Sequence, residues 1–347
     1  MNTFQLSIAL IILAGLFQGT FGLGMKRFRP LAWEAFWVLF TVIGMVAIPV
    51  VWSNLVIPDV SEAISATPGR DLAISVILGG VWGIGALMFG LAINYIGLAL
   101  AYGITMSLAA AVGSLIPLMT IEGHQSGPAV WLVVGSIAVM LLGVAILTWA
   151  GVLRDKLQAV SGQVIQGIRR GKGFYIGLLF AVLNGLGAAA LNVGFTKAQP
   201  AATAATRQGA LQRNASLAAW VIVLFGGFLV NLGYSVYLLA RNGSHKTFAS
   251  AGSIKGIIWA VITALLWFAA LGGYGQGAAL MGRLGPVIGW SMFLGLSLVI
   301  SSLLGLRDRE WEGMKGPVRV LFAGDAVILI SVIMLAYANY LAIANQS

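Results

Sequence analysis

Residues 4–24 read FQLSIALIILAGLFQGTFGLG without one charged side chain, and Lys26, Arg27 and Arg29 follow directly. A helix needs about 20 apolar residues to cross the ~30 Å hydrocarbon core of a bilayer, and this run is long enough. Nine further apolar runs follow, at about 32–57, 72–95, 98–119, 128–150, 174–196, 214–240, 255–280, 284–305 and 318–343. The sequence therefore predicts an all-α polytopic membrane protein with ten transmembrane helices.

Composition indicates the same class. Hydrophobic residues make up 59% of the chain and charged residues 9%, with a mean hydropathy of +0.96. Soluble domains do not have this composition. The net charge of +10 does not indicate a nucleic-acid partner, because the basic residues gather at the ends of the apolar runs. Cysteine is absent and the two histidines, His124 and His245, lie in loops, so we expect no metal centre and no cofactor.

The basic residues alternate between loops. Only five of the 20 follow even-numbered runs, namely Arg70, Lys197, Arg207, Arg213 and Arg283. The positive-inside rule places the richer, odd-numbered loops in the cytoplasm. Both termini should therefore face outward.

The two halves of the chain resemble each other. Gly97 lies between the third and fourth runs and Gly285 at the start of the ninth, and an aromatic residue, Tyr102 or Trp290, follows five positions later. An odd number of helices per half makes two such copies inverted, which is typical of secondary transporters. The predicted parts are a five-helix repeat at 1–150, a cytoplasmic linker at 151–173 and a second five-helix repeat at 174–347.

Polar side chains inside the runs are costly in a membrane and therefore informative. Gln18 and Asn184 occupy equivalent positions in the first helix of each half, so pseudo-symmetry would bring both to one central cavity. The alternative is a hydrogen bond between helices. The glycine-rich segment 272–277 suggests an unwound stretch that would let Trp267, Tyr274 and Gln276 reach the same cavity.

Aromatic rings stack on the C–H faces of sugars, and amides bond their hydroxyls, so this set suits a neutral polyol. Packing in the core is the alternative for each ring. The candidate substrate-binding residues are Gln18, Trp82, Tyr102, Asn184, Tyr274, Gln276 and Trp290.

The candidates for ion coupling are two carboxylates. Asp325 lies well inside the last run, and Glu34 begins the second run, where it would either close a gate with Lys26 or Arg27 or favour the helix N-terminus. The co-transported ion is H+ or Na+. Sodium would use the amide oxygens of Gln18, Asn184 and Gln276.

Four short motifs are distributed over both halves of the chain: Gln18-Gly19-Thr20-Phe21 with Trp33-Glu34, Trp82-Gly83-Ile84-Gly85, Tyr274-Gly275-Gln276-Gly277, and Glu310-Trp311-Glu312-Gly313. These stretches resemble the L-rhamnose–proton symporter family of the drug/metabolite transporter superfamily. The resemblance implies the drug/metabolite transporter fold, with ten helices in two inverted five-helix repeats. It also implies a bacterial inner-membrane protein, a monomer or homodimer, that imports a 6-deoxyhexose such as L-rhamnose or L-fucose by cation symport with alternating access.

Two other classes stay open. An exporter of drugs or metabolites on the same fold would place an acidic residue at the cavity centre, where the first run offers only Gln18. A membrane-embedded enzyme would need clustered His, Asp or Glu at one interface, and residues 307–312 are the only candidate. We therefore expect a transporter that is not an enzyme, whose partners are a small sugar and the lipid bilayer.

Overall fold

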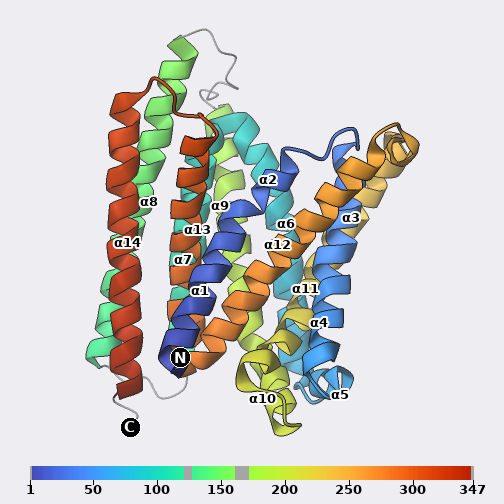
Figure 1. Cartoon of the computed structure of the whole chain (residues 1–347), viewed down its shortest axis with the longest axis vertical. Coiled ribbons are helices and arrows are strands. Elements are labelled where there is room, and N and C mark those ends of the chain that lie inside the picture. Colours follow the sequence, from blue (N-terminus) through green and yellow to red (C-terminus); the bar gives the residue numbers. More distant parts are fainter. Residues whose placement is uncertain (1, 121–126, 161–171, 345–347) are drawn as a thin grey trace. The chain divides into compact units, whose positions relative to one another are not determined.

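The computed structural model describes residues 2–120, 127–160 and 172–344. These residues are almost entirely helical and contain no strand. Ten segments among them are long and apolar enough to cross a membrane, and each overlaps one predicted run, which confirms the predicted fold class (Figure 1). They are Thr3–Met25, Trp33–Val56, Gly69–Ile96, Leu98–Thr120, Pro128–Gln158, Lys172–Arg207, Gln212–Arg241, Ser253–Leu280, Gly282–Arg307 and Lys315–Ile343.

The first five spans are built from eight helical segments. They are α1 (Thr3–Thr20), α2 (Gly22–Met25), α3 (Trp33–Val42), the π-helical turn η1 (Ile43–Ala47), α4 (Ile48–Val56), α6 (Gly69–Ile96), α7 (Leu98–Thr120) and α8 (Pro128–Val160). The last five are α9 (Lys172–Lys197) with α10 (Gln199–Arg207), α11 (Gln212–Arg241), α12 (Ser253–Leu280), α13 (Gly285–Arg307) and α14 (Lys315–Ala344). Short helices α5 (Val60–Ser65), η2 (Ser244–Ala249) and η3 (Gly282–Leu284) join them.

The structure adds detail at two places. Helix α8 continues to Val160, so residues 151–160 of the predicted linker are helical, whereas 161–171 lie outside the described residues, as does His124. Gly97 (φ +80°) and Gly282 (φ +71°) are left-handed at the turns before α7 and α13, whereas Gly285 is helical. Both turns need a left-handed residue, which glycine adopts without steric cost.

A π-helical turn interrupts the second span. The Ile48 N–H donates to the Ile43 carbonyl, five residues back, and Pro49 follows directly. Proline has no N–H to donate and its ring clashes with the carbonyl four residues earlier, so a regular α-helix is disfavoured here. Such turns are frequent at functional sites.

The chain forms two compact units, and each takes helices from both halves of the sequence. The first unit comprises Met1–Ile84 and Val193–Leu280, and the second comprises Gly85–Asn192 and Met281–Ser347. The divisions therefore fall inside α6 and α9. We describe each unit by itself.

Glycines bring the helices of the first unit together. Helix α1 packs along α12, with Ala14 against Gly273. Helices α6 and α11 approach so closely that a Cβ on Gly79 would collide with the Val223 carbonyl, and one on Gly226 with the Val76 carbonyl. Small residues permit such backbone approach in lipid, where the hydrophobic effect does not drive helices together.

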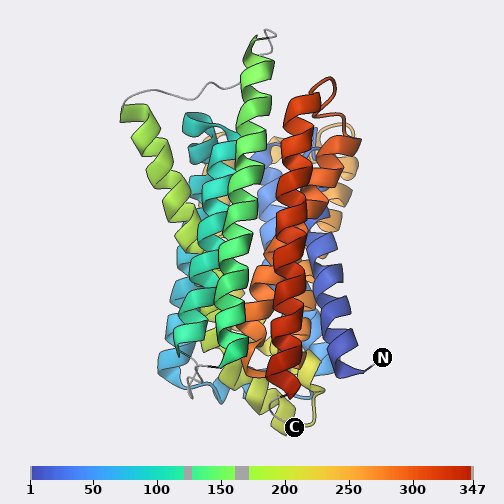
Figure 2. The same ribbon diagram turned by 90° about the vertical axis from the view of Figure 1, so that its left-hand side faces the viewer.

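In the second unit, α8 runs beside α14 over most of its length (Figure 2). Gly143 lies against Ile328 and Gly324 against Leu147, and the Ser331 hydroxyl donates to the Ser136 carbonyl at 2.7 Å. Helix α7 packs on α13 in the same unit.

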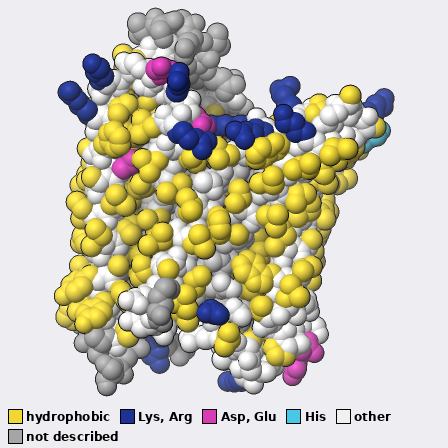
Figure 3. Space-filling model, viewed as in Figure 1, with side chains coloured by type: hydrophobic (Ala, Val, Ile, Leu, Met, Phe, Trp, Pro, Cys, Tyr) yellow, Lys and Arg dark blue, Asp and Glu magenta, His cyan; other side chains and the backbone are white. Residues whose placement is uncertain are grey.

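The helix surfaces have the distribution expected of a membrane protein. Large apolar side chains such as Leu55 (78% exposed), Trp131 (69%) and Ile333 (67%) lie open to the surroundings. Figure 3 shows hydrophobic side chains along the middle of the helices, with most visible Lys and Arg side chains near their ends. This pattern matches a lipid environment.

Candidate functional site

A stacked pair of tryptophans lies inside the first unit. Trp82 of α6 and Trp267 of α12 have ring centroids 5.7 Å apart and planes inclined by 15°. Phe40 of α3 meets Trp267 edge-on at 5.3 Å. The ring of Trp82 rests on Gly227 of α11, where a Cβ would come within 2.6 Å of it. The bare backbone of this glycine therefore leaves room for the Trp82 ring.

One buried amide orders the neighbouring helix. Asn231 of α11 accepts the indole N–H of Trp37 at 3.0 Å and donates to the Gly227 carbonyl at 2.9 Å. A fully buried amide must find partners, because each unmet hydrogen bond costs about 1–3 kcal/mol. Asn231 thus holds the Trp37 ring of α3 in one orientation beside the Trp82–Trp267 pair.

Gln18 presents an open acceptor in the same unit. Its Oε1 is buried and has no hydrogen-bond partner among the described residues. Gln18 is four residues after Ala14, which faces Gly273, and Gly24 faces Thr263, so the Gln18 side chain points toward α12. It lies at a level between Thr263 and Gly273, the stretch that includes Trp267.

The glycine-rich end of α12 is a continuous helix through Leu280, so the expectation of an unwound segment at 272–277 is wrong. Tyr274 is fully buried and packs edge-on to Trp220 at 6.0 Å. Gln276 donates to the Asn214 side chain at 3.2 Å. The glycines instead allow neighbouring side chains to pack closely, since Gly275 leaves room for the Trp220 ring.

The predicted residues of the second unit form hydrogen bonds within it. Asn184 of α9 donates to the Thr105 hydroxyl at 2.9 Å, and Trp290 of α13 donates to the Ala109 carbonyl at 2.9 Å. Tyr102 lies beside Phe89, with ring centroids 6.1 Å apart. For Asn184 this is the interhelical hydrogen bond that the sequence left open as the alternative.

Asp325 is the buried carboxylate of the second unit. It lies on α14 and is 5% exposed; the Ser302 hydroxyl of α13 is nearby, but neither carboxyl oxygen has good hydrogen-bond geometry with a described residue. An ionised carboxylate with so few partners is strongly unfavourable inside a membrane.

Glu34 is held differently, at the first turn of α3. Its Oε1 accepts from the Asn242 amide at 2.9 Å and from the Ser244 hydroxyl at 2.6 Å. The Arg27 guanidinium lies over the Trp259 ring at 4.8 Å. Two neutral donors and a helix N-terminus stabilise the charged form of Glu34.

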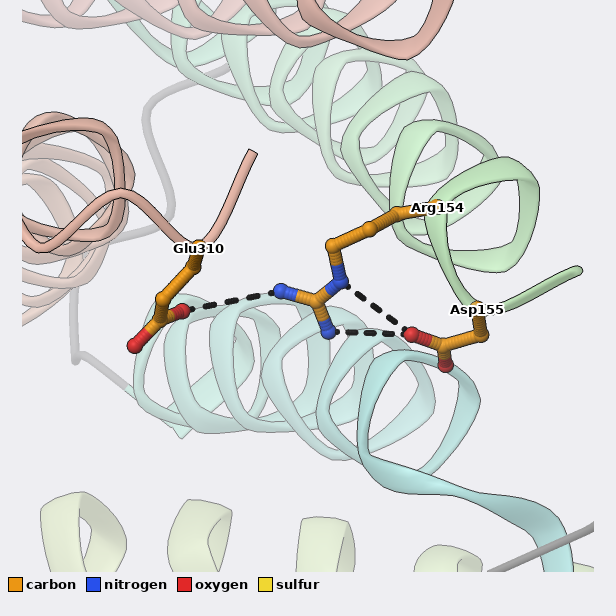
Figure 4. Close-up of polar contacts among 3 residues, drawn as sticks. All are labelled: Arg154, Asp155 and Glu310. Carbon is orange, nitrogen blue, oxygen red and sulfur yellow. Dashed lines mark hydrogen bonds and ion pairs between the residues drawn. The ribbon is translucent and has the colours of Figure 1, made fainter. Parts of the chain in front are cut away.

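A charged cluster fastens the end of α8 to the loop between α13 and α14 (Figure 4). Arg154 lies 3.0 Å from Asp155 and 3.6 Å from Glu310. Its guanidinium also lies over the Trp311 ring at 4.9 Å, and Trp311 is buried against Ala150 and Leu321. The Glu310-Trp311 motif is thus part of a structural contact.

Two features were not anticipated from the sequence. Trp37 joins the aromatic cluster, although its spacing of four after Trp33 and three before Phe40 already placed all three on one helix face. Asn231 is one of the few amides inside the apolar runs, which marks it as informative, but its role as acceptor for Trp37 depends on a neighbouring helix. Within the described residues, no group of three His, Cys, Asp or Glu side chains could hold a metal ion.

Known proteins match nearly the whole chain. The family model for the L-rhamnose-proton symport protein covers residues 1–339. The L-rhamnose-proton symporter of Cronobacter sakazakii is 28% identical over 318 residues, which is 88% of this chain and 89% of that protein. The L-rhamnose-proton symporter of Yersinia pestis is 26% identical over 318 residues, with 88% and 90% covered. The chain therefore belongs to the L-rhamnose-proton symport protein family, a family of membrane transporters and not of enzymes.

Proposed function

We propose that this protein imports L-rhamnose, or a close relative such as L-fucose, together with a proton across the bacterial inner membrane. The observation that carries the proposal is the stacked Trp82–Trp267 pair. Helix α1 places the unpartnered Gln18 Oε1 at the same level of the first unit. A flat aromatic surface beside an open acceptor suits a 6-deoxyhexose, which has apolar C–H and methyl groups as well as hydroxyls.

The other predicted substrate-binding residues are proposed here as supports of the site and not as direct sugar contacts. Tyr274 and Gln276 support the first unit, and Tyr102, Asn184 and Trp290 support the second. Packing positions a site even where the side chain itself is buried. Direct contact with sugar is proposed for Gln18 and Trp82.

Asp325 is the proposed proton carrier. A neutral, protonated carboxyl is tolerated in the buried position that α14 gives it, and exposure to the cytoplasm in another conformation would release the proton. The relatives are named proton symporters, which favours H+ over Na+. Glu34, already hydrogen-bonded by Asn242 and Ser244, is the second candidate.

Two inverted repeats, 1–150 and 174–347, would explain the helix pairing. In a five-plus-five scheme α1 is equivalent to α9, and α6 is equivalent to α12. The contact of α1 with α12 then has the contact of α9 with α6 as its counterpart. The other equivalent helices pair with each other, as α3 with α11, α7 with α13 and α8 with α14. This regularity, with the alternating basic loops, supports alternating access with both termini outside.

Uptake into proteoliposomes tests the proposal. L-Rhamnose, L-fucose and D-mannitol would be offered with an inward proton gradient, with an inward sodium gradient, and with neither. We expect saturable accumulation of a 6-deoxyhexose only with the proton gradient, and its loss on addition of a protonophore. Accumulation driven by sodium alone would contradict proton coupling, and no uptake of any deoxyhexose would contradict the sugar assignment.

A further inference from the structure

We propose that the first unit contains a second sugar-binding station, the α3 face, formed by Trp33, Trp37 and Thr41. The sugar would occupy this station on its way between the Trp82–Trp267 pair and the N-terminal end of α3, where Trp33 lies. The proposal rests on the proposed function, because it takes the occupant to be the transported 6-deoxyhexose.

The aromatic rings form a continuous series along α3 and into α12. Trp33 and Trp37 stack with centroids 5.2 Å apart and planes inclined by 15°. Trp37 lies 4.8 Å from Phe40, and Phe40 lies 5.3 Å from Trp267, which stacks on Trp82. A sugar leaving the Trp82–Trp267 pair would thus meet further ring faces of the same kind toward the end of α3.

The α3 face is directed toward neighbouring helices of the first unit. Trp37 donates to Asn231 of α11, and Phe40 meets Trp267 of α12, whereas Val42, nine positions after Trp33, lies on the opposite side and is 41% exposed. Trp33 is 36% exposed and Trp37 partly exposed, whereas Phe40 on the same face is 2% exposed. Rings that served packing alone would be buried like Phe40, so the open area of the two tryptophans is available for a ligand.

The alternative explanation for the exposed Trp33 and Trp37 rings is a tryptophan belt at the membrane surface, where Trp is enriched. Belt residues face the lipid, as the 69% exposed Trp131 and the 54% exposed Trp149 of α8 do. Trp37 differs from both in being fixed by the hydrogen bond to Asn231. A ring held in one orientation is suited to recognition, because little freedom is lost on binding.

Thr41 supplies the polar part of the α3 face. Its hydroxyl is fully buried and has no partner among the described residues. Other helical threonines, such as Thr148 and Thr263, donate to the carbonyl four residues back. Thr41 does not, and it stands just before the π-helical turn η1, one turn from Trp37. The Thr41 hydroxyl therefore keeps an unused donor and an unused acceptor one helical turn from the partly exposed Trp37 ring.

The test separates binding from passage in purified full-length protein. Equilibrium binding of L-rhamnose and its exchange across proteoliposomes would be measured for Trp33→Leu and Trp37→Leu, with Trp131→Leu as the matched control and Trp37→Phe as the conservative variant. We expect both α3 variants to slow exchange about five- to tenfold with the dissociation constant changed less than about twofold. Trp131→Leu should change neither quantity, and Trp37→Phe should keep most of the rate.

Three results would overturn the station. An exchange rate of Trp33→Leu within twofold of the wild-type rate would overturn it. This variant alone is sufficient for the test if Trp37→Leu does not fold. A rise in the dissociation constant equal to the loss of rate would mean that the α3 face belongs to the main site. Wild-type protein that binds neither L-rhamnose nor L-fucose would overturn the proposed function itself, and this result needs no variant.

Discussion

Tryptophans behave differently in the two units. In the first, Trp82 and Trp267 lie face to face and Trp37 is partly exposed. In the second, Trp290 is 3% exposed, and its N–H is bonded to the Ala109 carbonyl. The first unit thus leaves part of the Trp82 and Trp37 rings exposed, although Trp267 is itself 5% exposed, whereas Trp290 is enclosed in the second unit.

Carboxylates follow a similar division. Glu34 in the first unit has two hydrogen-bond donors, whereas Asp325 in the second has none within the described residues. The difference suggests that sugar recognition belongs to the first unit and proton binding to the second.

The largest expected effect concerns the proton. One charge moved across ~100 mV supplies about 2.3 kcal/mol, roughly fifty-fold accumulation. Asp325→Asn should abolish proton-driven accumulation of L-rhamnose but leave exchange of sugar for sugar. Glu312→Gln is the control, because Glu312 is exposed and makes only a 3.9 Å contact with Arg309. Normal accumulation of L-rhamnose by Asp325→Asn would contradict the assignment of proton binding to the second unit.

The next effect separates the two kinds of tryptophan. Trp82→Leu should weaken L-rhamnose binding by roughly thirtyfold, since aromatic anchors contribute about 2 kcal/mol to binding. Trp290→Leu should instead lower thermal stability, because it loses a buried hydrogen bond and creates a cavity. Titration calorimetry and melting curves of both variants give the comparison. Equal loss of affinity in both would show that Trp290 also contacts sugar.

Glycine contacts give a smaller effect on stability. Gly226→Ala should destabilise the protein by about 1.5 kcal/mol, because the new Cβ meets the Val76 carbonyl and the backbones must separate. Gly233→Ala on the same helix meets nothing within 4 Å and should be neutral or stabilising. Melting temperatures in detergent would check this, and an unchanged Gly226→Ala would contradict the close crossing of α6 and α11.

The smallest effect distinguishes two amides that the sequence paired. Gln18→Leu removes an unpartnered acceptor, so stability should hold while sugar affinity falls about fivefold. Asn184→Leu breaks the bond to the Thr105 hydroxyl and should cost about 1 kcal/mol of stability. Affinity and unfolding measured on both variants would test this. A stable Asn184→Leu with weakened binding would instead make the two amides equivalent, as pseudo-symmetry predicts.

Several residues of the proposed site could be picked out from the sequence. Gln18, Trp82 and Trp267 stood out because amides and aromatics within apolar runs are few, and membrane burial makes polar groups informative. The interior faces were less accessible. Helices α1, α12 and α13 carry apolar residues all around, so periodicity does not show which side meets protein and which meets lipid.

The sequence by itself determined the ten spans, the alternation of basic loops and the family, because span length and charge placement are local properties of the chain. Only the tertiary structure decided that Tyr274 packs against Trp220 while Trp82 stacks on Trp267, and that α12 stays helical through its glycines. Those outcomes depend on which helix lies opposite. A contact between helices far apart in the chain is set by the shape of both partners.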